Sequence, residues 1–166
     1  MAQPLLNISA VIEVEYGMFE LYAAGTEDAV VLAEYAVSLH QIVVPQPGGA
    51  RFMSAVRSGA VQLDLQVWEE VPGFPPADAW DRVEVAALNL GSNQCFIEAP
   101  TLGAQTDVIT LLPEVTEYFV RVAVRQRHEA MAAAEQYAVD GFEGEPPPPV
   151  EGWQLQFWPR TLDPHC

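Results

Sequence analysis

Two alternating stretches near the C-terminus constrain the fold more than any other part of the sequence. Residues 117–127 carry apolar side chains at every second position, namely Tyr118, Val120, Val122 and Val124. Residues 151–159 repeat the pattern with Trp153, Leu155 and Phe157. Successive side chains of a β-strand leave opposite faces of the sheet, so a period of two predicts a pair of half-buried antiparallel strands.

Similar short stretches recur along the chain, and turns rich in proline, glycine, serine or asparagine separate them. The predicted strands cover residues 8–24, 36–44, 51–56, 61–67, 82–90, 94–99 and 106–112. The turn Gly91-Ser92-Asn93 is expected to join the stretches on either side of it into a hairpin. About eight short strands of this kind predict an all-β fold, an antiparallel β-sandwich.

The first stretch changes phase at Gly17, because the apolar residues before and after this glycine fall on opposite faces. Either a β-bulge or two strands on different sheets accounts for the change. Residues 25–35 combine a helix-start signal with β-branched residues, and they are interpreted as a loop or a short helix.

One insertion separates the two C-terminal strands. Residues 128–138 are rich in alanine and place four residues at the spacing of one helical face: Ala130, Met131, Ala134 and Tyr137. Four consecutive prolines follow at 146–149 and are typical of a stiff spacer.

The expected domain organisation follows from these elements. Residues 1–159 form one sandwich domain, residues 128–150 are a helix and proline-rich loop inserted into it, and residues 160–166 are a flexible tail.

The charge is strongly negative, with 23 acidic residues against 7 basic ones and a formal net charge of −16. All basic residues are arginine, a usage associated with high-GC bacterial genomes. Such a charge repels nucleic-acid phosphates and anionic membranes and attracts basic partners. An acidic surface that serves solubility alone is the other interpretation.

The two cysteines predict no structural disulfide. Cys95 lies in an apolar run and is expected to be a buried thiol, while Cys166 is the last residue. Unpaired cysteines suit a reducing compartment, and no signal peptide or membrane-spanning run is visible. A bacterial cytoplasmic location is therefore expected.

No residue pattern points to catalysis, a metal or a cofactor. The histidines, His40, His128 and His165, lack the spacing of metal ligands. Nucleophile motifs and phosphate-binding glycine loops are missing from the sequence. Acid pairs such as Glu69-Glu70 are expected by chance in so acidic a chain. The protein is predicted to be no enzyme and to use no cofactor.

The candidate binding residues are acids and large aromatic residues on polar strand faces and in loops. They are Trp68, Glu69, Glu70, Asp78, Trp80, Asp81, Glu143 and Glu145. Trp158 also falls on a polar face. Exposed aromatic residues of this kind mark binding surfaces, unless another layer covers them and they belong to the core.

Three of the seven arginines lie close together in the first C-terminal stretch: Arg121, Arg125 and Arg127. They could bind an anion. The preferred interpretation is structural: the arginines pair with acids across the sheet, such as Glu13, Glu15 or Glu84, and hold the strands in register.

The two C-terminal stretches also resemble a known sequence pattern. Residues 118–127, Tyr-Phe-Val-Arg-Val-Ala-Val-Arg-Gln-Arg, and 153–159, Trp-Gln-Leu-Gln-Phe-Trp-Pro, are similar to the C-terminal signature of a mostly uncharacterised family of small actinobacterial β proteins. The layout, with Glu-Tyr-Gly-Met-Phe at 15–19, also resembles the competence protein J family of nuclease inhibitors. Gln126 and His128 depart from the pattern, where a glycine and an acid are usual.

This resemblance implies a non-enzymatic inhibitor or immunity protein that offers carboxylates where a basic partner, such as a nuclease, would bind DNA phosphates. The partner is expected to be a basic protein rather than a nucleic acid or a membrane, and the inhibitor a monomer or dimer. The alternative is a β-sandwich that binds a small ligand or carbohydrate through exposed tryptophans.

Overall fold

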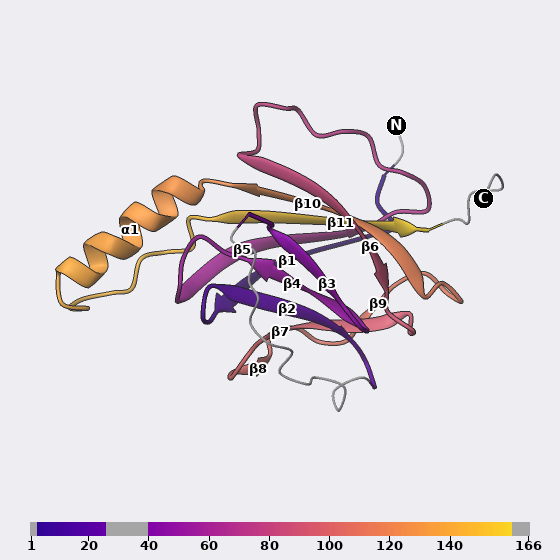
Figure 1. The fold of residues 1–166 in the computed structure, drawn as a ribbon, viewed down its shortest axis with the longest axis horizontal. Helices are drawn as coiled ribbons and strands as arrows, with labels where there is room; N and C mark the ends of the chain where they lie inside the picture. The colour runs from indigo at the N-terminus through magenta and orange to yellow at the C-terminus, as the bar shows by residue number, and fades with distance from the viewer. Residues whose placement is uncertain (1–2, 26–39, 161–166) are drawn as a thin grey trace.

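Two β-sheets pack face to face, and one helix projects from their end (Figure 1). The computed structural model describes residues 3–25 and 40–160. The first sheet runs β1 (Leu6–Val14), β5 (Gly59–Val67), β11 (Gly152–Pro159), β10 (Glu117–Arg125) and β6 (Arg82–Asn89). The second runs β3 (Val43–Gln46), β4 (Gly49–Met53), β2 (Met18–Ala23), β7 (Gln94–Ala99) and β8 (Gly103–Ala104), with β9 (Ile109–Thr110) also on β7. The predicted all-β sandwich is confirmed.

The C-terminal strands β10 and β11 pair antiparallel inside the first sheet, as predicted. Their alternating apolar residues face the second sheet and are buried. The indole of Trp153 meets the ring of Phe19 edge-on at 5.2 Å, and Phe19 stacks on Phe52 at 5.0 Å. This aromatic cluster joins the two sheets, because Trp153 belongs to one and the two phenylalanines belong to the other.

One strand pair departs from the antiparallel pattern: β11 lies parallel to β5, with Leu155 opposite Leu65. Parallel neighbours need a long crossover connection, which short turns between strands never supply. Between β5 and β11 the chain passes through β6, the second sheet, β10 and the helix. That path supplies the crossover. The alternation of apolar residues in a single strand does not indicate whether its neighbour runs parallel or antiparallel to it.

The phase change at Gly17 separates two strands on different sheets, so the bulge interpretation is wrong. Strand β1 belongs to the first sheet and β2 to the second. Between them Tyr16 and Gly17 both adopt positive φ, 53° and 78°. Each strand turns its own apolar face to the core, and the change of sheet produces the change of phase.

The hairpin predicted across 91–93 is wrong, although both strands exist. Strand β6 pairs with β10 in the first sheet, and β7 pairs with β2 in the second. Gly91, at φ 66°, reverses the chain as its turn chemistry predicts. The reversal carries the chain from one sheet to the other, so that Leu88 of β6 and Ile97 of β7 are both buried in the core, while Val83 and Val85 of β6 stay exposed.

Several other boundaries differ from the prediction. The β3–β4 hairpin turns at Pro47-Gly48, and His40 is exposed ahead of it rather than in a buried strand. Strand β4 ends at Met53, and the weak strand predicted over 106–112 is reduced to the two residues of β9. Predictions for residues 26–39 and 161–166 lie outside the described residues.

Candidate functional site

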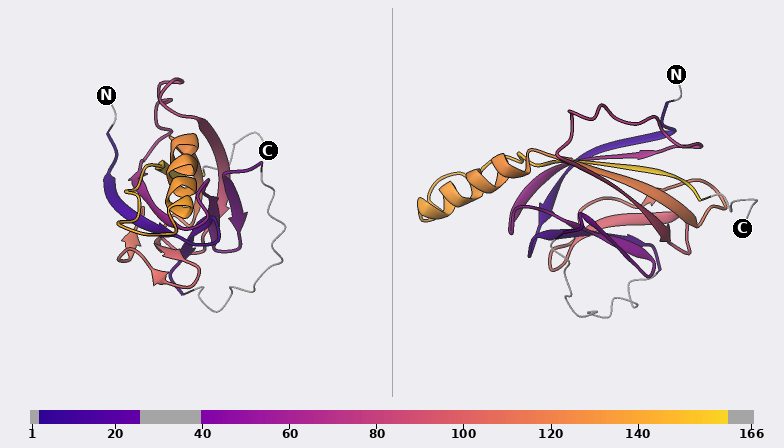
Figure 2. Two further views of the ribbon diagram at one scale, coloured as in Figure 1. Left: turned by 90° about the vertical axis from the view of Figure 1, so that its left-hand side faces the viewer. Right: turned by 45° about the horizontal axis from the view of Figure 1, so that its top comes forward.

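The insertion between β10 and β11 forms an arm, here residues 127–150, that stands away from the sandwich (Figure 2). Helix α1 (Arg127–Val139) confirms the helix expected at 128–138. Of its thirteen residues only Ala130 is buried. A helix of this length is marginal in isolation and needs tertiary contacts. The arm therefore depends on its connection to the sandwich.

That connection is a cluster of charged and polar groups, here the root cluster, made of Ser54, Arg127 and Glu151. Glu151 is 0% exposed, and its carboxylate accepts hydrogen bonds from the Ser54 hydroxyl and, at 3.0 Å, from the Ala55 amide. One guanidinium nitrogen of Arg127 lies 3.2 Å from the same carboxylate and donates to the Met53 carbonyl at 2.9 Å. A buried carboxylate with this many donors is stable only in one geometry, so it fixes the start of the arm.

The backbone at the start of α1 is equally constrained. Gln126 has a positive φ of 59°, which turns the chain out of β10 and into the helix. The Asp81 carboxylate accepts a hydrogen bond from the Arg127 amide at 3.0 Å, a favourable place for a negative charge at a helix N-terminus. A Cβ on Gly152 would lie 2.9 Å from Nε of Arg125, so glycine lets the two ends of the arm approach each other.

A groove of about 780 Å³ lies between the arm and the end of the sandwich. One wall comes from α1 and the proline-rich loop, and the other from the β1–β2 turn and the chain that leads into β5. The aromatic residues of the groove are Tyr16, Tyr137 and Phe142. Tyr137 and Phe142 meet edge-on at 5.4 Å, and Tyr16 and Phe142 are 60% and 67% exposed. The groove is mainly apolar.

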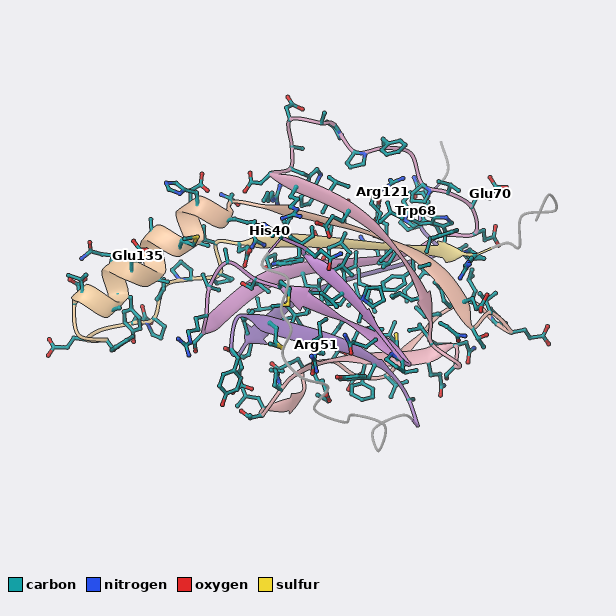
Figure 3. The ribbon with its side chains drawn as sticks, viewed as in Figure 1. His40, Arg51, Trp68, Glu70, Arg121 and Glu135 are labelled. Carbon is teal, nitrogen blue, oxygen red and sulfur yellow. The ribbon has the colours of Figure 1, made fainter. Side chains whose placement is uncertain are left out.

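The charges around the groove are mostly negative. Glu13, Glu15 and Arg57 are its charged lining residues. The hydroxyl and amide of Thr101 donate to the Glu15 carboxylate and hold its pKa below the usual value. The arm beyond Arg127 holds five exposed acids and no arginine: Glu129, Glu135, Asp140, Glu143 and Glu145. Figure 3 shows Glu135 on the projecting helix.

The predicted arginine cluster is divided by the structure. Arg121 and Arg125 lie on the outer face of the first sheet, whereas Arg127 begins α1 and belongs to the root cluster. Cross-sheet pairing with Glu13, Glu15 or Glu84 is wrong, since Glu84 pairs with Arg82 on its own strand. Glu84 also accepts the Ile42 amide at 3.0 Å and so links the edges of the two sheets.

Arg121 is 2% exposed and has no carboxylate partner among the described residues. It donates to the carbonyls of Gly73 at 2.8 Å and Pro72 at 3.0 Å, and to Oε1 of Gln156 at 3.0 Å. Its guanidinium also lies 4.5 Å from the ring of Phe74. Burial lowers the pKa of Arg121 from its ordinary value. The side chain fastens the loop that covers the sheet.

Six of the eight predicted binding residues lie in that covering loop, residues 68–81, and Figure 3 labels two of them, Trp68 and Glu70. They are Trp68, Glu69, Glu70, Asp78, Trp80 and Asp81. The other two, Glu143 and Glu145, lie on the arm. Asp81 supports α1, and Trp80 is half-buried with the guanidinium of Arg125 at 5.2 Å from its ring. The eight residues therefore belong to two separate surfaces, and their binding role stays a prediction.

The tryptophans contribute to packing rather than to the large groove. Trp158 is buried, 5.5 Å from the guanidinium of Arg121, and the Trp68 indole donates to Gln66 at 3.2 Å. Arg121, which binds the covering loop, lies against Trp158, and Trp68 is the first residue of that loop. A small hollow of about 310 Å³ brings Trp68, Glu69 and Glu70 together.

The groove residues were missed by the sequence analysis. Tyr16 has the only visible signal, an aromatic residue before a glycine at a change of phase. Tyr137 is one of the four residues expected on one helical face, and Phe142 precedes the prolines that are typical of a stiff spacer. Their common wall depends on the angle at which the arm leaves the sandwich, which no local pattern records.

Other chemistry is limited within the described part of the chain. Residues 3–25 and 40–160 hold no group of three or more histidine, cysteine or acidic side chains that could bind a metal. No described helix is long and apolar enough to cross a membrane. Cys95 is buried as predicted, and burial raises the pKa of its thiol to about 12.

Comparisons with known proteins show a related fold. The structure is similar to that of ComJ from Bacillus subtilis, described as an inhibitor of the DNA-degrading activity of NucA: the TM-score is 0.62 at 8% identity, over 96% of this chain and 99% of ComJ. It is also similar to the protein of crocagin biosynthetic gene J, with a TM-score of 0.55 at 15% identity, over 95% of this chain and all of the other. No family model and no curated protein sequence matches the chain. The ComJ-like fold expected from the C-terminal strands is confirmed; an actinobacterial origin stays a prediction.

Proposed function

We propose that this protein is a non-enzymatic inhibitor or immunity-type domain that binds a basic partner protein, such as a nuclease, in the bacterial cytoplasm. Its fold is similar to that of a nuclease inhibitor. Such an inhibitor works by presenting carboxylates to the cationic surface that otherwise binds DNA phosphates. Occupation of that surface excludes the nucleic acid.

The observation that carries this proposal is the separation of charges over the molecule. Three arginines, Arg51, Arg82 and Arg127, neutralise acids within the fold. Arg121 is buried against backbone carbonyls. The arm, by contrast, exposes five acids without an arginine beyond its first residue. An unneutralised acidic projection gives fast, salt-sensitive association with a basic protein.

The test is inhibition of a nuclease from the organism that encodes the protein. Tagged protein recovers partners at low and at high salt, and each nuclease recovered is purified and assayed for DNA degradation with and without the inhibitor. We expect stoichiometric inhibition, with an affinity that falls at least about tenfold when salt rises from low to physiological concentration.

A variant with the arm acids Glu129, Glu135, Glu143 and Glu145 changed to glutamine controls for the charge. It should fold normally, because these side chains are exposed, and should inhibit more weakly. Recovery of no nuclease, or inhibition that neither salt nor this variant alters, contradicts the proposal.

The small hollow at Trp68 supports a second candidate function. An aromatic side chain beside two carboxylates, Glu69 and Glu70, can stack on a sugar ring and accept hydrogen bonds from its hydroxyl groups. A thermal-shift screen of glycans separates the two functions, because only a ligand-binding protein gains stability from a small molecule. If a glycan raises the melting temperature of the protein but not that of Trp68→Ala, the glycan binds at this hollow.

A further inference from the structure

The arm carries an apolar surface that is only partly covered: Ala130 belongs to the core and Ala134 packs against it, while Tyr137, Ala138 and Phe142 lie along the open groove. The residues of α1 that line the groove are Ala130, Ala133, Ala134, Tyr137 and Ala138. Phe142 and the prolines extend this wall beyond the helix. Water against so many apolar groups is unfavourable, and burial of the wall would stabilise the helix that carries it. Such a wall is suited to bind an apolar surface of another molecule.

The opposite wall includes an aromatic residue in an uncommon backbone conformation. Tyr16 has a φ of 53°, a region that non-glycine residues other than asparagine and aspartate rarely occupy. Its ring is largely exposed at the groove. The root cluster fixes the separation of the walls, since Glu151 and Arg127 join the arm to the chain at Ser54. The groove is therefore preformed.

We infer that this groove receives a short apolar segment of the partner, flanked by lysine or arginine. The inference rests on the proposed function and names its binding surface. A groove of about 780 Å³ accommodates several side chains. The apolar walls suit apolar residues. Glu13 and Glu15 line one side of the groove, together with one arginine, Arg57. The five exposed acids of the arm lie outside the lining but on the arm that forms the other wall, so cations that flank the apolar segment are favoured.

The charges argue against other occupants. Phosphate groups of a nucleic acid or a membrane would meet Glu13 and Glu15 in the groove and the exposed acids along the arm, against a single lining arginine, Arg57. A second copy of the chain would bring one acidic arm against another. A basic protein gains from the same arrangement, and the apolar centre then supplies specificity that charge alone lacks.

The inference is tested with a random peptide library displayed on phage and selected on the complete protein. Selection should enrich sequences with an apolar centre and lysine or arginine on its flanks. The peptides are synthesised, and their affinities are measured by fluorescence anisotropy. Ala134→Trp, which fills the groove, should weaken binding at least about tenfold, the loss of one well-buried apolar anchor.

Matched variants separate the groove from the remaining surface. The pair Tyr137→Ala and Phe142→Ala removes one aromatic wall and should have the effect of Ala134→Trp. Leu102→Ala, also an exposed apolar residue, should have none. The pair Glu135→Gln and Glu145→Gln should weaken binding and reduce its salt dependence. The pair Asp107→Asn and Glu114→Gln, equally exposed but away from the arm, should leave both unchanged.

The outcomes distinguish this inference from the proposed function. Three results overturn the inference that the groove binds this segment: the selection enriches no sequence, it enriches acidic sequences, or the selected peptides bind Ala134→Trp as well as the original protein. The inference is also overturned if the free protein forms a dimer and Ala134→Trp abolishes that dimer, since a second copy of the chain is then the occupant of the groove. Nuclease inhibition that survives Ala134→Trp leaves the function standing without the groove. Groove-dependent peptide binding without inhibition of any nuclease removes the function instead.

Discussion

The covering loop and the arm are two insertions of similar composition with opposite structures. Both contain several prolines, several acids and an exposed phenylalanine, Phe74 in one and Phe142 in the other. The loop lies on the first sheet, where Arg121 binds its carbonyls. The arm is fastened at its start and stands off beyond it. The position of the buried charged contact, and not composition, decides which insertion covers a surface and which creates a groove.

The largest effect is expected from the root cluster. Glu151→Ala leaves Arg127 without its carboxylate and removes the acceptor for the Ala55 amide. Loss of one partner of a buried pair costs about 3–5 kcal/mol, so the free energy of unfolding in urea should fall by about 4 kcal/mol. Glu135→Ala, an exposed acid on the same arm, is the control and should change it by less than about 0.5 kcal/mol. If Glu151→Ala lowers the free energy of unfolding as little as Glu135→Ala does, the root cluster is not what holds the arm.

Arg121→Ala should release the covering loop at a somewhat smaller cost. Three hydrogen bonds from a buried guanidinium are lost, and the free energy of unfolding should fall by about 3 kcal/mol. The folded variant should also be cleaved by protease between 69 and 79. Arg125→Ala, which loses a cation–π contact with Trp80 and none of the hydrogen bonds that hold the loop, should cost about 0.5 kcal/mol and leave the loop protected. An uncleaved loop in Arg121→Ala means that other contacts hold it.

Alkaline pH should destabilise the shared core beneath both insertions. Burial raises the pKa of Cys95 to about 12 from an ordinary value of 9.0. Between these values the unfolded thiol has lost its proton and the folded thiol keeps it, so stability falls as pH rises from 9 towards 12. We expect the free energy of unfolding to fall by about 1 kcal/mol per pH unit above pH 9. Urea unfolding at pH 8, 9, 10 and 11 measures this loss. Cys95→Ala should flatten the profile between pH 9 and 10, before the tyrosines ionise; an unchanged slope there assigns the loss to other groups.

Tyr16→Asn should sharpen the distinction between stability and binding at the groove. Asparagine accepts positive φ more readily than tyrosine, so the free energy of unfolding should rise by about 0.5 kcal/mol. Binding of a groove peptide should nevertheless weaken, since an exposed aromatic ring is lost. If Tyr16→Asn instead lowers the free energy of unfolding, the Tyr16 ring contributes to packing rather than to binding.

The sandwich was predictable because alternation is a local property that each strand records by itself. Tyr118, Val120 and Val122 face the core for the reason that their spacing indicates. The helix was predictable from its alanine content, and the buried Cys95 from its apolar neighbours. Each of these predictions needs only residues that are close together in the chain.

Strand partners and the candidate site depended on the tertiary structure. The turn at Gly91 indicated a reversal but not that β6 and β7 would join different sheets. Arg121 found two backbone carbonyls and Gln156 where acids were expected, since the covering loop lies over it. The groove exists because Glu151 and Arg127, distant in sequence, meet in the root cluster. By itself the sequence determined which faces are apolar and how negative the surface is; only packing, which joins residues far apart in the chain, decided where those faces and charges meet.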